Sequence, residues 1–229
     1  MEKNILENLL TPDQLRISNE YANLIFFENK KFNLTGLKNI EDIKNTLINE
    51  SIISLFYANV KLNNAIKVID IGTGAGIPGI PFKIINNDLD MTLVDSNLKK
   101  CNFLKKVSEE LDLDIKIVCA RTEDLAHDEK HRESYDNCIS RAVSNISTLN
   151  EYSFPFLKIS GKSIYIKGRN ISQEIIDSEY SAKILGGNFI NYSTPTNMSS
   201  IVIYEKVKKT PSHYPRKPGI PKKSPLGII

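Results

Sequence analysis

The chain has 229 residues, of which 41% are hydrophobic and 25% are charged, and its formal net charge at pH 7 is +3. This composition is typical of a globular protein, and no apolar run approaches the roughly 20 residues that span a bilayer, so we expect no membrane segment and no signal peptide. The three cysteines are widely spaced, which argues against a disulfide framework or structural zinc and favours a reducing cytoplasm.

The charge is unevenly distributed along the chain. Residues 208–229 carry six bases and no acid, so the first 207 residues carry three more acids than bases. Such asymmetry indicates a polyanionic partner, although on charge alone a solvated tail that adds solubility is the favoured interpretation. This tail also holds five of the ten prolines, which predicts an extended or irregular arm without helix.

The first 60 residues have helical patterns. Thr11 and Pro12 are typical of a helix start, and apolar residues follow at loosely helical spacing until about residue 33. A second apolar helical pattern runs from about residue 40 to 58. We therefore predict an N-terminal helical extension over residues 1–60.

Strand and helix patterns alternate in the next part of the chain, residues 61–207. Five short β-branched runs lie at 67–71, 91–95, 115–119, 135–140 and 163–166, with helical patterns at 98–111, 146–157 and 172–185. Two last strands, 188–192 and 201–207, have no helix between them and should pair as an antiparallel hairpin. Five parallel strands followed by such a hairpin predict an α/β fold, the Rossmann-like sheet of AdoMet-dependent methyltransferases, with residues 208–229 as a basic tail.

A glycine cluster, Asp70-Ile-Gly72-Thr-Gly74-Ala-Gly76-Ile-Pro-Gly79, follows the first strand. Glycines there let the backbone turn sharply and let a ligand approach closely, beyond the carboxyl end of the strand. Asp95 ends the second strand 23 residues after Gly72, a spacing typical of a carboxylate that binds ribose hydroxyls.

Two ligand classes compete for this loop, and a third interpretation is a tight turn without ligand. Gly74–Gly79 matches the dinucleotide fingerprint, but Asp70 suits a ligand with ammonium and sulfonium centres better than a pyrophosphate. Pro78 and Pro81 also remove N–H donors that a pyrophosphate would need. These features favour AdoMet.

The ends of the third and fourth strands add two candidate contacts. In the loop Arg121-Thr-Glu-Asp124, Glu123 or Asp124 could accept a hydrogen bond from the adenine amine, although a solvated turn explains either acid equally well. Ser140-Arg141-Ala142 would face the transferred methyl group, and it lacks the Asn/Asp-Pro-Pro-aromatic motif of exocyclic-amine enzymes. Cytosine-C5 enzymes need a nucleophilic cysteine, typically after a proline, and no cysteine of this chain follows a proline. What remains is an acceptor with its own lone pair, such as a ring nitrogen.

Taken together, these motifs resemble the RsmG (GidB) family of bacterial 16S rRNA guanine-N7 methyltransferases. The resemblance covers nearly the whole chain, and it is most specific in the glycine loop with its Pro-Gly-Ile-Pro81 continuation and in the tail motif Tyr214-Pro-Arg-Lys-Pro-Gly219. Further matching motifs are Phe32–Gly36, Leu93–Ser96, Arg121–Glu123, Ser140–Ala142 and Ile166–Gly168. The family's usual His and Asp in the second helix are replaced by Leu47 and Glu50, and Ile77 and Thr122 are milder departures.

The resemblance implies AdoMet as methyl donor and a guanine of 16S rRNA, the family's guanine-527 site, as acceptor. Implied or expected AdoMet contacts are Asp70, Gly72, Gly74, Gly76, Ile77, Asp95, Ser96, Thr122, Glu123 and Arg141. Because a ring nitrogen can attack directly, we expect in-line methyl transfer governed by positioning. Arg141 and Lys167 are the candidate catalytic residues, and Arg141 would orient AdoMet or hold a phosphate rather than act as a base.

The expected partner is the 16S rRNA of the small ribosomal subunit, bound by a monomer in the cytoplasm without metal or membrane. The candidate RNA contacts are Lys167, Arg169, Tyr214, Arg216, Lys217, Lys222 and Lys223. Truncation after Val207 is therefore expected to weaken RNA binding and leave AdoMet affinity unchanged. His127 and His131 do not have H-E-x-x-H spacing, which favours a solvated segment over zinc. The alternatives are methylation of another RNA, a protein or a small molecule, an NAD(P)-binding oxidoreductase, and a silent RNA-binding module.

Overall fold

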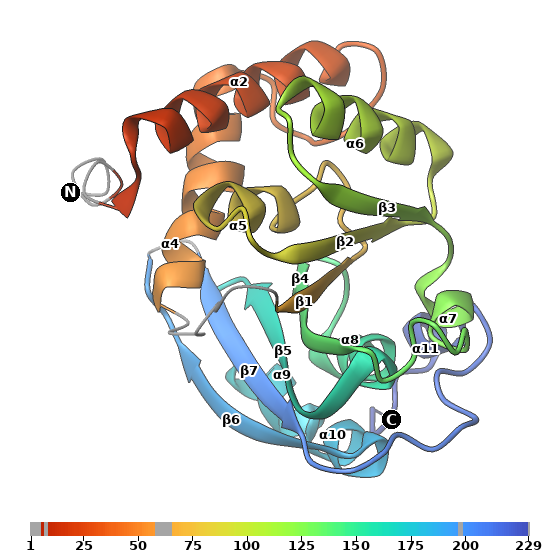
Figure 1. Ribbon diagram of the computed structural model, residues 1–229. Helices are drawn as coiled ribbons and strands as arrows, with labels where there is room; N and C mark the ends of the chain where they lie inside the picture. Colours follow the sequence, from red (N-terminus) through yellow and green to blue (C-terminus); the bar gives the residue numbers. More distant parts are fainter. Residues whose placement is uncertain (1–5, 7–8, 58–65, 197–198, 229) are drawn as a thin grey trace.

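The computed structural model describes residues 6, 9–57, 66–196 and 199–228, and its centre is a seven-stranded sheet (Figure 1). The predicted boundary at residues 60 and 61 lies outside the described residues. In space the strands follow the order β3-β2-β1-β4-β5-β7-β6. Their bounds are β1 Lys67–Ile71, β2 Asp90–Asp95, β3 Ile115–Cys119, β4 Tyr135–Arg141, β5 Leu157–Lys167, β6 Gly187–Ser193 and β7 Ser200–Lys206.

The directions of the strands confirm the predicted fold. Strands β1 to β5 pair in parallel, whereas β7 is antiparallel to both β5 and β6. Parallel neighbours need a crossover, and helices of the chain supply it between these strands; β6 and β7 are joined without one and form the hairpin. The carboxyl ends of β1 to β4 therefore meet at one edge of the sheet.

Helices cover both faces of the sheet (Figure 1). On one face lie α2 (Pro12–Asn29), α3 (Ile40–Asp42), the π-helix η1 (Ile43–Asn49), α4 (Glu50–Tyr57), α5 (Gly79–Ile85) and α6 (Leu98–Glu110). On the other lie α8 (Ile146–Ser153), α9 (Ser172–Asp177) and α10 (Glu179–Leu185), while α7 (Thr122–Leu125) and α11 (Ile220–Lys223) lie at the sheet edge. None of the described helices is long and apolar enough to cross a membrane.

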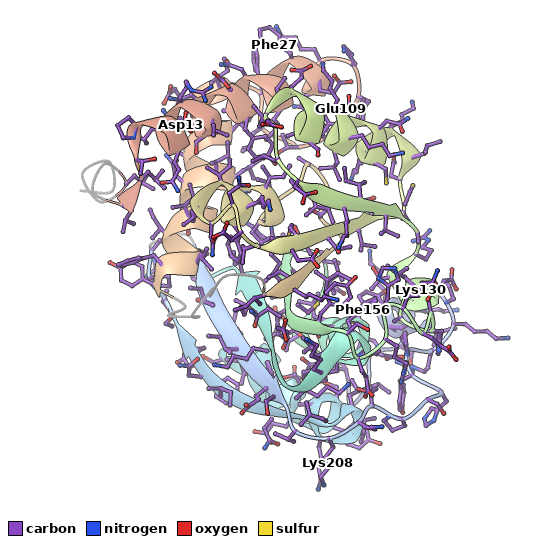
Figure 2. All side chains as sticks on the ribbon, viewed as in Figure 1. Asp13, Phe27, Glu109, Lys130, Phe156 and Lys208 are labelled. Carbon is purple, nitrogen blue, oxygen red and sulfur yellow. The ribbon has the colours of Figure 1, made fainter. Side chains whose placement is uncertain are left out.

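Successive side chains of a strand point to opposite faces of the sheet and contribute to two separate hydrophobic cores. Val68 packs with α2, α5 and α6, whereas its neighbour Ile69 packs with α8 and α10. Phe156 lies fully buried in the second core, while Phe27 points outward from α2 with 57% of its surface exposed (Figure 2). The side to which a strand residue points thus decides which layer of helices it meets.

The N-terminal helices pack closely on the glycine loop. Thr11 and Gln14 form a capping box at the start of α2, which explains the helix start that the sequence indicates. The amide of Gln14 also donates to the backbone carbonyls of Ile84 and Ile85 at the end of α5. The buried Tyr21 hydroxyl donates to the Ala75 carbonyl at 2.6 Å, so α2 directly supports the loop.

Several helices differ from their predicted extents. The predicted helix at 40–58 contains seven π-helical residues, and the one at 146–157 changes to a 3₁₀ turn, η2 (Phe154–Phe156), where Pro155 has no N–H for an α-helical bond. The predicted helix at 172–185 is broken at Ser178, whose hydroxyl donates to the Ile175 carbonyl. Helix α5 was not predicted, because glycines and prolines obscure its start.

Candidate active site

A pocket of about 170 Å³ lies at the carboxyl edge of the sheet, where a ligand binds in doubly wound folds. It is bounded by the ends of β1 to β4, by α7 and α8, and by the C-terminal tail. Its lining residues are Gly72, Asp95, Ser96, Ala120, Arg121, Thr122, Glu123, Val143, Ser144, Tyr152 and Lys222. Five of the predicted cofactor contacts, on three different loops, thus lie around one cavity.

The glycine loop forms one wall of this pocket. Gly72 has a φ of +65°, and a Cβ there would lie 2.8 Å from Cγ2 of Val143, so only glycine fits between the ends of β1 and β4. The Gly74 amide donates to Asp95 Oδ2 at 3.0 Å, and the Asn97 amide donates to Oδ1 at 2.9 Å. Asp95 therefore ties the glycine loop to the end of β2 while its side chain borders the cavity.

Asp70 lies behind the loop, outside the pocket lining. It is fully buried, and its Oδ2 accepts hydrogen bonds from the Thr73 hydroxyl at 2.6 Å and the Gly79 amide at 2.9 Å. Burial raises its pKa to about 7, against the lowering effect of these two hydrogen bonds. Gly76 and Ile77 also lie outside the lining, and Gly76 approaches Tyr21. The structure gives these residues a place in shaping the loop, and their direct contact with the cofactor stays a prediction.

Of the two acids after β3, Glu123 faces the cavity and Asp124 is exposed. Glu123 is 5% exposed, and its Oε1 accepts from the Tyr152 hydroxyl at 3.3 Å and from the Gly219 amide of the tail at 2.9 Å. Burial and the neighbouring Glu123 raise the pKa of Tyr152, so its hydroxyl stays a donor at neutral pH. Glu123 therefore lines the cavity and also holds the C-terminal tail.

Arg141 turns from the pocket toward the N-terminal helices. It follows Ile139 by two residues on β4, so it points to the same face, that of η1 and α4. Its guanidinium donates to the carbonyls of Thr46 and Leu47 and to the Ser51 hydroxyl, at 2.6, 3.0 and 3.0 Å. In this arrangement Arg141 fastens the end of β4 to η1, and contact with AdoMet or a phosphate stays a prediction.

Lys167 lies on the opposite face, close to the pocket wall. Its ammonium donates to the carbonyl of Ser144, a lining residue, at 2.6 Å and forms an ion pair with Glu174 at 2.8 Å. Arg169, two residues later, is exposed. These positions leave Arg169 open to a large polyanion, whereas Lys167 is engaged within the protein.

The tail packs along the body beside α7 and α8 (Figure 1). Arg216 pairs with the fully buried Glu151 at 2.6 Å, and Arg132 donates to the carbonyls of Thr210, Pro211 and Tyr214. The expectation of a tail without helix is wrong at α11, where Pro221 occupies the first turn and needs no N–H partner. Lys222 reaches the pocket, and Lys217 and Lys223 are exposed.

The two histidines that the sequence singles out have separate hydrogen-bond partners. His127 donates from its Nε2 to the Pro215 carbonyl of the tail, and His131 is hydrogen-bonded through Nδ1 to the Tyr135 hydroxyl. His127 thus adds one more attachment between the body and the tail.

Four lining residues, Ala120, Val143, Ser144 and Tyr152, were not predicted, and Arg121 was named only as part of the loop after the third strand. Ala120, Val143 and Ser144 lie shortly after the ends of the third and fourth strands, so their place beyond a strand end was a usable signal. Tyr152 had no such signal, because it lies within helix α8 and reaches the pocket only through the packing of α8 against the sheet edge.

The residues around this pocket fit AdoMet. Asp95 and Glu123 offer carboxylate acceptors at two loops, as ribose hydroxyls and an adenine amine require, and Gly72 brings the backbone at the end of β1 to the cavity wall. The two acids also suit a cationic sulfonium compound better than a pyrophosphate. Asp95, Ser96, Thr122 and Glu123 are therefore the residues that would hold it.

Comparison with known proteins agrees with this geometry. Residues 14–199 match the GidB family, described as rRNA small subunit methyltransferase G. The "Ribosomal RNA small subunit methyltransferase G" of Clostridium botulinum (strain Loch Maree / Type A3) is 43% identical over 90% of this chain and 88% of its own. That of Carboxydothermus hydrogenoformans is 37% identical over 93% of this chain and 92% of its own.

The sheet also resembles solved structures. A putative S-adenosyl-L-methionine-dependent methyltransferase from Methanococcus maripaludis superimposes with a TM-score of 0.56 over 75% of this chain and 92% of its own, at 20% identity, which shows a shared fold. The family match covers most of the chain, and the relatives cover nearly all of it. The chain belongs to the rRNA small subunit methyltransferase G (GidB) family, whose methyl donor is AdoMet.

Proposed function

We propose that the protein methylates N7 of a guanine in 16S rRNA, at the family's guanine-527 site, as a monomer in the cytoplasm. The observation that carries this proposal is the pocket at the carboxyl edge of the sheet, in a chain of this family. The two acids that line the pocket accept hydrogen bonds from the protein. Asp95 accepts from two backbone amides, and Glu123 accepts from Tyr152 and Gly219.

The roles of Asp95 and Glu123 limit which substrate group can accept the methyl group. When bound, AdoMet supplies an electrophilic methyl group on a sulfonium. We assign Asp95 and Glu123 to AdoMet rather than to proton transfer, and a guanidinium such as that of Arg121 cannot act as a base. An acceptor that needs no deprotonation suits such a site, and guanine N7 has an in-plane lone pair. The protein then accelerates the reaction chiefly by holding both partners in line.

The exposed bases near the pocket support an RNA acceptor over a protein or a small molecule. Arg169, Lys217 and Lys223 are exposed, and Lys222 lines the pocket. We propose that these four contact the phosphate backbone, with Lys167 beside them at the Ser144 carbonyl. Arg216 and the partly buried Tyr214, which packs on the second core, instead attach the tail to the body.

The test is methylation in vitro. The purified protein is incubated with methyl-labelled AdoMet and either naked 16S rRNA or small ribosomal subunits, and labelled N7-methylguanine is mapped by chemical cleavage. We expect label at a single guanine of at least one of the two substrates. Label at an amino group or a carbon of a base, or label recovered only in ribosomal protein, contradicts the proposal.

A further inference from the structure

An ion pair attaches the C-terminal tail to helix α8 immediately beside the pocket. The Arg216 guanidinium donates through Nε and Nη2 to both oxygens of Glu151, at 2.9 and 2.6 Å, and the Arg216 amide donates to Oε1 as well. Glu151 is fully buried. Nη2 also donates to the Ser224 carbonyl at 2.8 Å, so this one side chain closes the tail segment 216–224 into a loop.

The segment closed in this way forms part of the pocket wall. Its Gly219 amide donates to Oε1 of Glu123, and its Lys222 lines the cavity. Tyr152, the neighbour of Glu151 on α8, donates to the same oxygen of Glu123. The tail, α8 and Glu123 are thus joined by consecutive hydrogen bonds.

We propose that the Glu151–Arg216 ion pair positions this pocket wall, so that AdoMet binds tightly only while the tail is docked. The proposal rests on the proposed function for the identity of the ligand. Without the ion pair, Glu123 loses the Gly219 donor that fixes its carboxylate, and the cavity opens where Lys222 stands. This differs from the expectation that loss of the tail leaves AdoMet affinity unchanged.

Because the guanidinium is forked, lysine can replace Arg216 in this ion pair only in part. The Arg216 side chain makes charge-assisted bonds to both oxygens of one carboxylate and a further bond to a carbonyl, which the single ammonium of lysine cannot reproduce. A substitution series at this position therefore grades the attachment of the tail without touching a residue of the pocket lining.

The test compares Arg216→Gln and Arg216→Lys in the full-length protein. AdoMet affinity is measured calorimetrically without RNA, and the KM for AdoMet and kcat are measured with RNA. For Arg216→Gln we expect Kd and KM for AdoMet to rise about tenfold, while kcat at saturating AdoMet and saturating RNA changes less than about twofold. Arg216→Lys, which keeps the buried carboxylate paired, should fold and give an intermediate rise.

A matched control is Asp136→Asn. It breaks the ion pair of Asp136 with Lys158, at 2.7 Å, where β4 and β5 begin, at the edge of the sheet away from the pocket and the tail. This variant should keep the wild-type Kd. Wild-type AdoMet affinity in both Arg216 variants, with the tail shown by limited proteolysis to be released, overturns the proposal. AdoMet binding that responds as expected, without RNA methylation, would instead refute the proposed function alone.

Discussion

The glycine loop owes its shape to a buried carboxylate as much as to its glycines. Asp70 accepts hydrogen bonds from the Thr73 hydroxyl and the Gly79 amide at one oxygen, while its other oxygen has no hydrogen-bond partner among the described residues. The sequence predicts a functional acid at this position, but it does not show which way the side chain points. That direction follows from the alternation of β1, which turns Asp70 toward α5 and away from the pocket edge.

We predict that Asp70 makes stability depend on pH. Its pKa is about 7 in the folded protein and near the ordinary 3.8 when unfolded, so the folded state binds more protons between these values. Its contribution is therefore present below about pH 4 and is lost as pH rises to 7, by on the order of a few kcal/mol. In Asp70→Asn, the fall in unfolding free energy between pH 5 and 7.5, measured with urea, should be shallower than in wild type. An equal slope in both proteins contradicts this assignment.

At the scale of elements, the N-terminal helices act as a brace behind the pocket. Tyr21 of α2 supports the loop at Ala75, and η1 receives Arg141 from the end of β4. The Thr46 and Leu47 carbonyls of this π-helical segment accept the guanidinium. Leu47, which stands where the family has His, thus contributes through its backbone.

Substitution of Arg141 separates the brace from direct cofactor binding. Arg141→Ala removes three hydrogen bonds from a mostly buried cation, so the free energy of unfolding should fall by about 2–4 kcal/mol. Urea denaturation measures this, with AdoMet and RNA affinities measured separately at low temperature, where the variant is folded. Unchanged stability with lost AdoMet binding would instead place the guanidinium on the cofactor.

The sequence was sufficient for the strands but not for every helix. Strand runs such as 91–95 and 115–119 are short, β-branched and bounded by polar residues, so their position and parallel order could be predicted. The π-segment in 43–49 and helix α5 could not, because an apolar helical pattern does not distinguish a π-helical turn from an α-helical one, and α5 begins in a loop rich in Gly and Pro. In the site, loop residues after strands were predictable, whereas Tyr152 and the Gly219–Glu123 contact depend on tertiary packing.

Over the whole molecule, the basic tail has two kinds of residue. Arg216 and Tyr214 face the body, whereas Lys217 and Lys223 are exposed near the pocket edge. The net charge of +3 conceals this arrangement, because an acidic body carries a basic segment that is docked beside its pocket. Lys208, where the tail begins, projects from the opposite end of this segment (Figure 2).

The exposed lysines should determine the salt dependence of RNA binding. Lys217→Gln and Lys223→Gln should each reduce the slope of log affinity against log salt by about one, with AdoMet affinity unchanged. Lys158→Gln is the matched control, because Lys158 lies at the start of β5, on the edge of the sheet away from the pocket, and pairs with Asp136. The measurement is RNA affinity over a series of KCl concentrations. The same slope in Lys217→Gln and Lys223→Gln as in Lys158→Gln would contradict the assignment of Lys217 and Lys223 to the RNA-binding surface.

The most direct measurement is a map of N7-methylguanine in 16S rRNA from cells with the gene, cells without it, and deleted cells that carry it on a plasmid. We predict one N7-methylguanine that disappears on deletion and returns with the plasmid copy. The same modified guanines in all three rRNAs would contradict it.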